Sequence, residues 1–261
     1  MKTAPKRRLE LQAIPGIPRI QAGMPLTEIL VEALGDAELE DGDILAVTSK
    51  LYSRAQGRFV LLDEVEVSER ARALAAEVDK EPALVELILQ ESVAISRKRP
   101  GVLIVRHRHG FVCANAGIDR SNAHPADAPA HTQGRWALLL PLAPDEDARA
   151  LRDAAQERYG KRNGVVITDS HGRPFRNGTV GIAIGAAGLP TLDPHTDRVD
   201  LDGRPLEVTV TAVADQVAAA ADLLAGQADE SCPFILLRGL QLEGDSPATT
   251  LVRDPEADLY A

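Results

Sequence analysis

The stretch VVITDSHGRPFRNGTVGIAIGAAG, which runs from Val165 to Gly188, decides the fold because it places polar side chains directly after an apolar run. Val165 to Thr168 have the composition of a buried strand, and Asp169 and Ser170 follow where that strand is expected to end. Ligands of open α/β sheets collect beyond the carboxyl ends of strands. A carboxylate and a hydroxyl are hard oxygen donors for Mg²⁺ or Mn²⁺. The stretch therefore fits the strand end of an α/β sheet that carries a metal–phosphate site.

Two arginines, Arg173 and Arg176, continue the stretch in a segment rich in turn-forming residues. Their guanidinium groups offer forked donors to phosphate or carboxylate, so we expect them to bind such groups of a substrate. The same window also fits a hairpin that carries a surface Asp and two solvated arginines. The window alone leaves both interpretations open.

The composition narrows the class of protein. The chain has 261 residues, 44% of them hydrophobic, which is enough for one large domain or two small ones. Only 3% are aromatic, which favours layered helices and sheets over a platform for stacking bases. The net charge of −10 argues against general binding to nucleic acid or anionic membranes, which requires a basic footprint. Small anionic substrates remain compatible, because metal ions and local arginines reverse the local field.

The cysteines and the N-terminus indicate the compartment. Cys113 and Cys232 lie far apart, form no zinc or CxxC spacing, and are expected to be buried free thiols. The N-terminal sequence MKTAPKRRLELQAIPG is basic but has no apolar core, so it is not expected to be a signal peptide. No apolar run approaches the roughly 20 residues of a membrane helix. We therefore expect a soluble cytoplasmic protein.

Three further segments give weak signals for ligand binding. The loop from Pro15 to Pro18 is rigid and shaped, Ser49 and Lys50 follow a predicted strand, and Asp119 and Asn122 share a predicted turn. Each also fits an ordinary turn that satisfies its own backbone. The chain has no Walker A motif, no GxSxG elbow and no GxGxxG fingerprint, so NAD binding is a poor interpretation.

Hydrophobic periodicity and terminus signals predict the secondary structure. Helices are expected at Thr27–Leu34, Ser68–Val78, Pro82–Leu89, Asp145–Tyr159 and Thr211–Leu224. Strands are expected at Leu9–Ile14, Ile44–Val47, Val102–Val105, Trp136–Leu140, Val165–Thr168, Glu207–Val210 and Pro233–Leu237, with a hairpin at Asp197–Leu206.

Six segments taken together point to one family. They are PGIP (15–18), DGDILAVTSK (41–50), NAGIDRSN (115–122), ITDSHGRPFRNGTVGIAIGAAG (167–188), ADQVAAAADLLAGQADE (214–230) and LVRDPEADLY (251–260). Their order and spacing resemble the coenzyme F420-0:L-glutamate ligases, also called F420-0:γ-glutamyl ligases. The resemblance implies a mixed α/β fold assembled as an intertwined homodimer. It also implies one domain over residues 1–261, without the nitroreductase-like domain that is fused to some relatives.

The resemblance implies a ligase that depends on GTP and on a divalent metal. Such enzymes join L-glutamate to the carboxylate of F420-0 and then add a γ-linked glutamate. We expect an acyl-phosphate intermediate, two Mn²⁺ or Mg²⁺ ions, GTP as co-substrate and possible assistance by K⁺. The expected partners are these small molecules and a second copy of the chain, with no nucleic acid and no membrane.

Site residues follow from the matching motifs. The resemblance implies the metal ligands Asp119, Asp169, Ser170 and Gln227. It implies GTP contacts from Pro15, Gly16, Ile17, Pro18, Ser49, Lys50, Arg54, Asn122, Ala225, Gly226, Gln227, Ala228, Asp229, Glu230, Ser231 and Cys232. Arg54 stands where many relatives have Lys, Ser170 where Thr is common, and Gln227 where some have Glu, which removes one negative charge. No residue is assigned as a general base.

Two alternatives remain open from the sequence. One is a related GTP- and metal-dependent amide ligase with a different carboxylate acceptor, because the acceptor pocket is the part that sequence describes least. The other is a non-catalytic nucleotide-binding protein. The expectation common to both ligase hypotheses is that Asp119 and Asp169 converge on one site.

Overall fold

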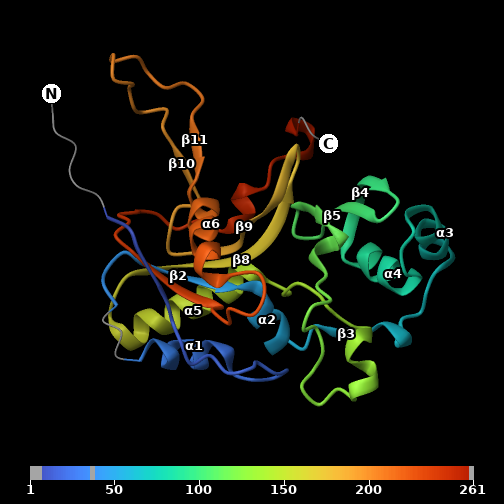
Figure 1. Ribbon diagram of the computed structural model, residues 1–261. Coiled ribbons are helices and arrows are strands. Elements are labelled where there is room, and N and C mark those ends of the chain that lie inside the picture. The colour runs from blue at the N-terminus through green and yellow to red at the C-terminus, as the bar shows by residue number, and fades with distance from the viewer. Residues whose placement is uncertain (1–7, 36–38, 259–261) are drawn as a thin grey trace.

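A five-stranded mixed sheet lies at the centre of the computed structural model, which describes residues 8–35 and 39–258 (Figure 1). The strand order is β1 (Glu10–Ala13), β12 (Phe234–Arg238), β2 (Asp43–Thr48), β8 (Asn163–Arg173) and β9 (Arg176–Ala187). Strands β2 and β8 are parallel, and the other neighbours are antiparallel. Residues 1–7, which belong to the N-terminal segment MKTAPKRRLELQAIPG, lie outside the described residues. Residues 259–261, at the C-terminal end of the sequence, lie outside them too.

The two central strands are buried because helices cover both faces of the sheet. Alternate residues of a strand point to opposite faces, so Leu45 joins the core with α1 (Leu26–Leu34) and α5 (Pro144–Tyr159), while Ile44 joins the core with α6 (Val213–Ala225). Figure 1 shows α1 and α5 below the sheet and α6 above it. This burial explains why β2 is an apolar run without polar alternation.

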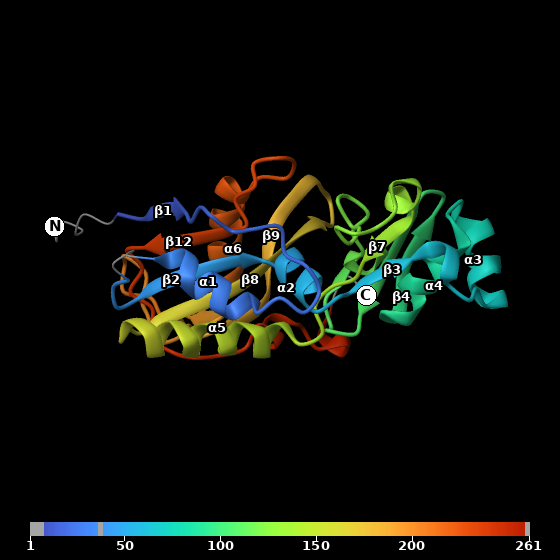
Figure 2. The ribbon, with the colours of Figure 1, turned by 90° about the horizontal axis from the view of Figure 1, so that it is seen from below.

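A second group of elements, coloured cyan to green, packs beside the sheet (Figure 2). It contains α3 (Glu69–Val78), α4 (Pro82–Gln90), the antiparallel sheet β4 (Ser92–Arg99), β5 (Val102–His107) and β6 (Val112–Ala114), and the pair β3 (Phe59–Leu61) and β7 (Trp136–Leu138). These elements share their own hydrophobic core, which includes Val85, Ile88 and Leu103. Helix α2 (Ser49–Ala55) connects this group to β2.

The remaining elements are the strands of a projecting arm and several short 3₁₀ helices. Strands β10 (Leu192–Pro194) and β11 (Val210–Ala212) form the base of a projecting arm, residues 192–212. The 3₁₀ helices cover Leu62–Glu64, Asn115–Gly117, Ala130–Arg135, Ala248–Leu251 and Pro255–Ala257. The longest helix, α5, has 16 residues, and within the described ranges no helix is long and apolar enough to cross a membrane.

Local signals explain the helix boundaries that the sequence predicted. Ser68 caps α3, because its Oγ accepts a hydrogen bond from the Ala71 amide at 3.2 Å. Pro82 begins α4, and Gly35 ends α1 with φ of 53°, a conformation that glycine adopts freely. The predicted arm hairpin is also present, closed by hydrogen bonds between Asp200 and residues 203 and 204.

Two strand predictions were wrong. Strand β8 does not end at Thr168 but continues to Arg173, because β9 supplies ladder partners such as Gly181 for Ser170. The strand expected at residues 207–210 lies instead at Val210–Ala212.

Candidate functional site

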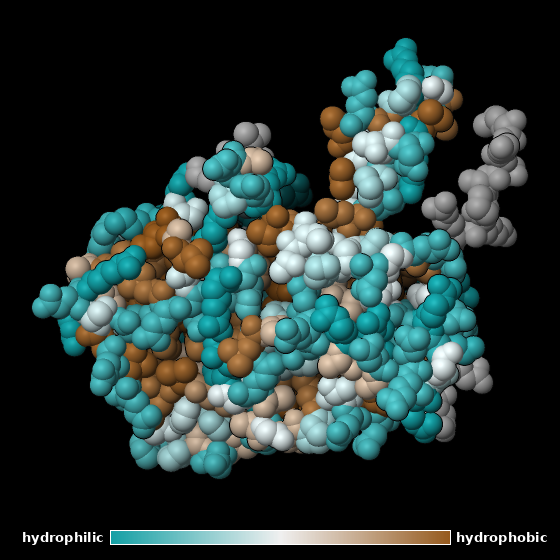
Figure 3. All heavy atoms as spheres, turned by 180° about the vertical axis from the view of Figure 1, so that it is seen from behind, coloured by the Kyte–Doolittle hydropathy of each residue, from teal (hydrophilic) through white to brown (hydrophobic). Residues whose placement is uncertain are grey.

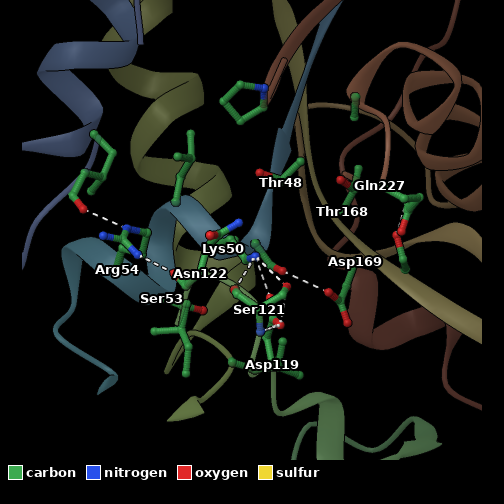
Figure 4. A pocket seen from close by; sticks show the side chains of 18 of the residues that line it. Thr48, Lys50, Ser53, Arg54, Asp119, Ser121, Asn122, Thr168, Asp169 and Gln227 are labelled. Atoms are coloured by element: carbon green, nitrogen blue, oxygen red, sulfur yellow. Dashed lines mark hydrogen bonds and ion pairs between the residues drawn. The ribbon is translucent and has the colours of Figure 1, made fainter. Parts of the chain in front are cut away.

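A cavity of about 790 Å³ lies where the parallel pair β2 and β8 ends (Figure 4). Thr48 and Thr168 are the last paired residues of these strands, and both line the cavity. Its other walls include residues 17–20, α2, residues 117–119 and 121–122, and residues 225–228 and 231–233. The cavity therefore occupies the position beyond the carboxyl ends of parallel strands where ligands of α/β sheets bind.

Asp169 is held in this cavity from two sides. Ser49 Oγ donates a hydrogen bond to Asp169 Oδ1 at 3.1 Å, and His171 Nε2 donates to Oδ2 at 2.8 Å. Asp169 and His171 share one face of β8 because they are two residues apart. The His171 ring is buried and makes an edge contact with Phe111, with ring centroids 5.0 Å apart. These contacts fix the orientation of the Asp169 carboxylate.

Asp119 also lines the cavity, but its carboxylate is already neutralised. Lys50 Nζ lies 2.6 Å from Asp119 Oδ2, and Ser121 donates its amide and hydroxyl to Oδ1 at 2.7 and 2.8 Å. Burial alone would raise the pKa of Asp119, but the hydrogen bond and charge of Lys50 outweigh it and hold the pKa below its ordinary value. Backbone bonds between Asp119 and Leu138 anchor the segment.

Ser170, Gln227 and Asp222 form a connected polar group on another wall. Gln227 Nε2 donates to Ser170 Oγ at 2.8 Å and to Asp222 Oδ1 at 2.7 Å, and Ser170 Oγ lies 3.4 Å from the same oxygen. Burial raises the pKa of Asp222, opposed by hydrogen bonds from Ser170, Gly181 and Gln227, while the charge of Asp169 adds to the rise. The two carboxylates therefore lie close enough to repel each other.

Arg54 is buried, and its side chain connects two loops by hydrogen bonds. Its Nε donates to the Ile20 carbonyl at 2.8 Å and its Nη1 donates to the Asn122 carbonyl at 2.9 Å. The guanidinium carbon lies 5.0 Å from the centroid of the Phe59 ring. Nη2 is buried and has no hydrogen-bond partner among the described residues, although Arg54 lines the cavity. An unpaired buried N–H is costly, so this nitrogen is available to donate a hydrogen bond to a ligand oxygen.

The structure brings most of the expected site residues to the cavity. Asp119, Asp169, Ser170, Gln227, Ile17, Pro18, Ser49, Lys50, Arg54, Asn122, Ala225, Gly226, Ala228, Ser231 and Cys232 all line it. Pro15, Gly16, Asp229 and Glu230 are expected contacts that do not line it. The Glu230 carboxylate instead accepts the Ala228 amide at 2.8 Å and so shapes the loop. The assignment of these residues to metal or nucleotide stays a prediction.

The two arginines of the hairpin lie away from the cavity. Arg173 and Arg176 flank the turn between β8 and β9, and neither is among the lining residues. Arg173 Nη2 donates to the Asn177 carbonyl at 3.3 Å within the turn. The hairpin is therefore present, with Arg176 exposed and Arg173 half-buried at its turn, whereas Asp169 belongs to the cavity.

Sequence reasoning missed several residues of the cavity, most importantly Asp222. The others with polar side chains are Arg19, Ser121 and Thr168, whereas Thr48 and Ser53 line the cavity beside Ser49 and Lys50 as their place after a strand suggests. Asp222 lies in the alanine-rich helix α6 one position after the buried Ala221. An acidic residue next to the buried face of an otherwise apolar helix is the signal that could have identified it.

The donors around Asp169 fit a divalent cation in chemistry but do not form a complete cage. Carboxylates, a hydroxyl and an amide are the oxygen ligands that Mg²⁺ and Mn²⁺ prefer. Within the part of the chain that the structure describes, no three His, Cys, Asp or Glu side chains are grouped as for a metal ion. An ion at this position would need substrate or water oxygens to complete its coordination, which is usual for Mg²⁺ at phosphate sites.

Comparison with known proteins identifies the family. The model of the F420-0:Gamma-glutamyl ligase family matches residues 16–239. Two proteins called coenzyme F420:L-glutamate ligase are similar to this chain. The one from Methanopyrus kandleri is 41% identical to it and the one from Methanothermobacter thermautotrophicus 39%, each over 257 residues. These alignments cover 97% of this chain and 97% and 98% of the relatives. The relative from Archaeoglobus fulgidus is 40% identical over 252 residues, covering 97% of this chain and 96% of its own. The chain is therefore an enzyme of the F420-0:gamma-glutamyl ligase family.

Proposed function

We propose that this enzyme ligates L-glutamate to the carboxylate of coenzyme F420-0, using GTP and a divalent metal ion, and then adds further γ-linked glutamate. The full-length similarity to proteins named coenzyme F420:L-glutamate ligase supports the substrates. The observation that carries the proposal is the cavity beyond β2 and β8, where Asp169, Lys50 and Arg54 meet. All three substrates are anionic, so such a site needs cations in a protein whose net charge is −10.

Basic and hydroxyl groups on one side of the cavity support binding of the nucleotide phosphates. Lys50 provides a mobile ammonium group, Ser49 a hydroxyl, and Arg54 a buried guanidinium with the unpaired Nη2. Guanidinium and ammonium groups form strong, charge-assisted hydrogen bonds to phosphate oxygens. Arg19 lies at the same wall and adds a further positive charge.

Asp169, Ser170 and Gln227 are the residues that would hold a divalent ion, through their oxygen atoms. A bound ion there would neutralise phosphate charge and orient the transferred phosphoryl group. Asp119 is a less direct candidate, because Lys50 and Ser121 already occupy its oxygens. Its role in this conformation is to position Lys50.

The reaction needs activation because a carboxylate and an amine do not condense unaided at neutral pH. Attack of the F420-0 carboxylate oxygen on the γ-phosphorus of GTP breaks the bond to GDP and forms an acyl phosphate. The glutamate amine then attacks the acyl carbon, inorganic phosphate leaves, and the amine loses a proton as the amide forms. The chain contributes by holding the phosphates with Lys50 and Arg54 and by aligning the reacting groups. No side chain of the cavity is assigned as the proton acceptor.

Mass spectrometry of F420-0 after incubation with the enzyme, GTP, Mn²⁺ and glutamate tests this function. We expect a series of products that differ by one glutamate residue, and none when EDTA is added or when ATP replaces GTP. Asp169→Asn should abolish the products without unfolding the chain. Glutamate addition to a different carboxylate, but not to F420-0, would support the alternative amide ligase. No glutamate addition to any acceptor would contradict the proposal.

The arm supports the assembly of two copies. Val199, Val208 and Val210 are 60%, 86% and 52% exposed, and Leu201 is fully exposed at the turn. Figure 3 shows hydrophobic residues along this arm, projecting from the body. Exposed apolar residues concentrated on one projection are typical of an interaction site. Light scattering should report a homodimer that becomes monomeric in Leu201→Asp/Val208→Asp, whereas a monomeric unmodified protein would contradict this part.

A further inference from the structure

We propose that Asp222 is a carboxylate ligand of the metal ion, together with Asp169. The inference rests on the proposed function, because it concerns the metal ion required there. It identifies Asp222 on α6, a residue of the segment 214–230 to which the resemblance assigns no role, as part of the chemistry. The structural support comes from the path of β8, the packing of α6 and the contacts of the Asp222 carboxylate.

Strand β8 borders the cavity with both of its faces. Its last residue paired with β2 is Thr168, whereas β8 continues to Arg173. The edge of β8 that would face β2 is therefore open from Asp169 onward. Asp169 points to one face of β8 and Ser170 to the other, and both line the cavity. A ligand beyond Thr48 can thus be reached from both faces.

Gly181 allows α6 to approach the second face closely. Gly181 on β9 is the ladder partner of Ser170. A Cβ atom on Gly181 would lie 2.5 Å from the Ala218 carbonyl oxygen and 3.0 Å from Asp222 Cβ. Only a residue without a side chain lets the helix lie this near to the strand. The close packing places the Asp222 carboxylate beside the Ser170 hydroxyl.

The contacts of Asp222 leave it capable of binding a cation. Both of its side-chain hydrogen bonds, from Gln227 Nε2 and Ser170 Oγ, reach the same oxygen, Oδ1. The Gly181 amide also donates to this carboxylate. Within the described residues Oδ2 has no side-chain hydrogen bond, and Asp222 forms no ion pair with a Lys or Arg there. Asp169 and Asp222 both line the cavity, so one cation bound there can neutralise both negative charges.

A purely structural role makes a different prediction. If Asp222 only accepts hydrogen bonds from Gln227 and Ser170, asparagine can replace it, because its amide oxygen accepts the same bonds. If Asp222 binds the ion, asparagine removes the negative charge that the ion requires. Affinity for the metal therefore separates the two roles, whereas stability does not.

The experiment is a titration of the full chain with Mn²⁺ in the presence of GDP, followed by electron paramagnetic resonance of the free ion. We expect Asp222→Asn to weaken Mn²⁺ binding by about tenfold or more, the scale on which residues of a metal site act. Asp222→Glu, which keeps the charge, should bind Mn²⁺ more tightly than Asp222→Asn. Asp215→Asn is the matched control, since Asp215 lies on the same helix but binds the Ala183 amide, outside this cavity.

The outcomes distinguish this inference from the proposed function. Unchanged Mn²⁺ affinity in Asp222→Asn, with loss of binding in Asp169→Asn, would overturn the role of Asp222 and leave the proposed function standing. Absence of Mn²⁺ binding by the unmodified protein with GDP would overturn both. A thermal melt of each variant shows whether lost binding follows from unfolding. If Asp222→Asn does not fold, a folded Asp222→Ala takes its place: Mn²⁺ affinity about tenfold or more below that of the unmodified protein supports the assignment, and unchanged affinity overturns it.

Discussion

The Lys50 ammonium nitrogen lies 2.6 Å from Asp119 Oδ2, so two groups from separate segments of the cavity wall neutralise each other. Lys50 also donates to the Ser121 carbonyl at 3.1 Å. Both side chains are about one-third exposed, at 36% and 33%, so Lys50 can exchange this partner for a phosphate oxygen at little cost. The pair keeps the ammonium group at the cavity and Asp119 near it.

Substitution of Lys50 tests its contact with the nucleotide. We expect Lys50→Met to raise the KM for GTP about tenfold or more, because a charge-assisted bond to phosphate is lost. Steady-state kinetics with saturating F420-0 and glutamate measure this change. Lys98→Met is the control, since Lys98 pairs with Glu77 on the surface of β4. Equal KM values for GTP in the two variants would show that Lys50 does not contact the nucleotide.

His171 should act as a positioning residue for Asp169. Its ring donates to Asp169 Oδ2 at 2.8 Å and is 6% exposed. His171→Leu removes this donor, and we expect Mn²⁺ affinity and kcat/KM to fall about tenfold. His171→Gln can still donate a hydrogen bond and should recover part of both. Mn²⁺ titration and kinetics check the prediction, and equal losses in both variants would indicate that only ring packing against Phe111 matters.

The close approach at Gly181 predicts a localised loss of stability. In Gly181→Ala the new methyl group would meet the Ala218 carbonyl at 2.5 Å, so α6 or β9 must shift. We expect a loss of about 1–3 kcal/mol in the free energy of unfolding. The control is Gly172→Ala on neighbouring β8, where no atom lies within 4 Å of the new Cβ. Urea unfolding compares the two, and similar losses would contradict the tight packing of α6.

Asp147 predicts a dependence of stability on pH. Burial raises the pKa of its carboxyl to about 6, against a hydrogen bond from Gln56 and with added repulsion from Glu146. The folded state thus binds the proton more tightly than the unfolded state, so the contribution of Asp147 to stability is present below about pH 4 and is lost as pH rises through about 6.

Asp147→Asn removes this loss, because the neutral amide keeps an acceptor for Gln56. We expect the variant to be more stable than the unmodified protein by about 1–2 kcal/mol at pH 7 and to be equal to it near pH 4. Chemical denaturation at the two pH values measures the difference. A constant difference across that range would mean that Asp147 titrates normally in the folded state.

The sequence predicted those parts of the fold that depend on local signals. The apolar runs 44–47 and 165–168 became the parallel centre of the sheet, and Ser68 and Pro82 began their helices as expected. The extension of β8 past Thr168 was missed, because it depends on pairing with β9 and not on the propensities of Ser170 or Gly172.

The sequence predicted only those residues of the site whose role follows from a family motif. Asp119 and Asp169 were correctly expected to reach one cavity, but the pairing of Asp119 with Lys50 was not foreseen. Asp222 was missed because helix–sheet packing at Gly181, and no spacing along the chain, brings it to Ser170. Arg173 was misplaced because a side chain near Asp169 in sequence can lie at the far end of a hairpin.

A crystal structure of the enzyme with GDP and Mn²⁺, with the anomalous signal of manganese, tests the central claim most directly. The account predicts a manganese peak at coordination distance from a carboxylate oxygen of Asp169, on the side of Asp222, with nucleotide phosphates reaching Lys50 and Arg54. A peak remote from Asp169, or a nucleotide bound outside the cavity beyond β2 and β8, would contradict it.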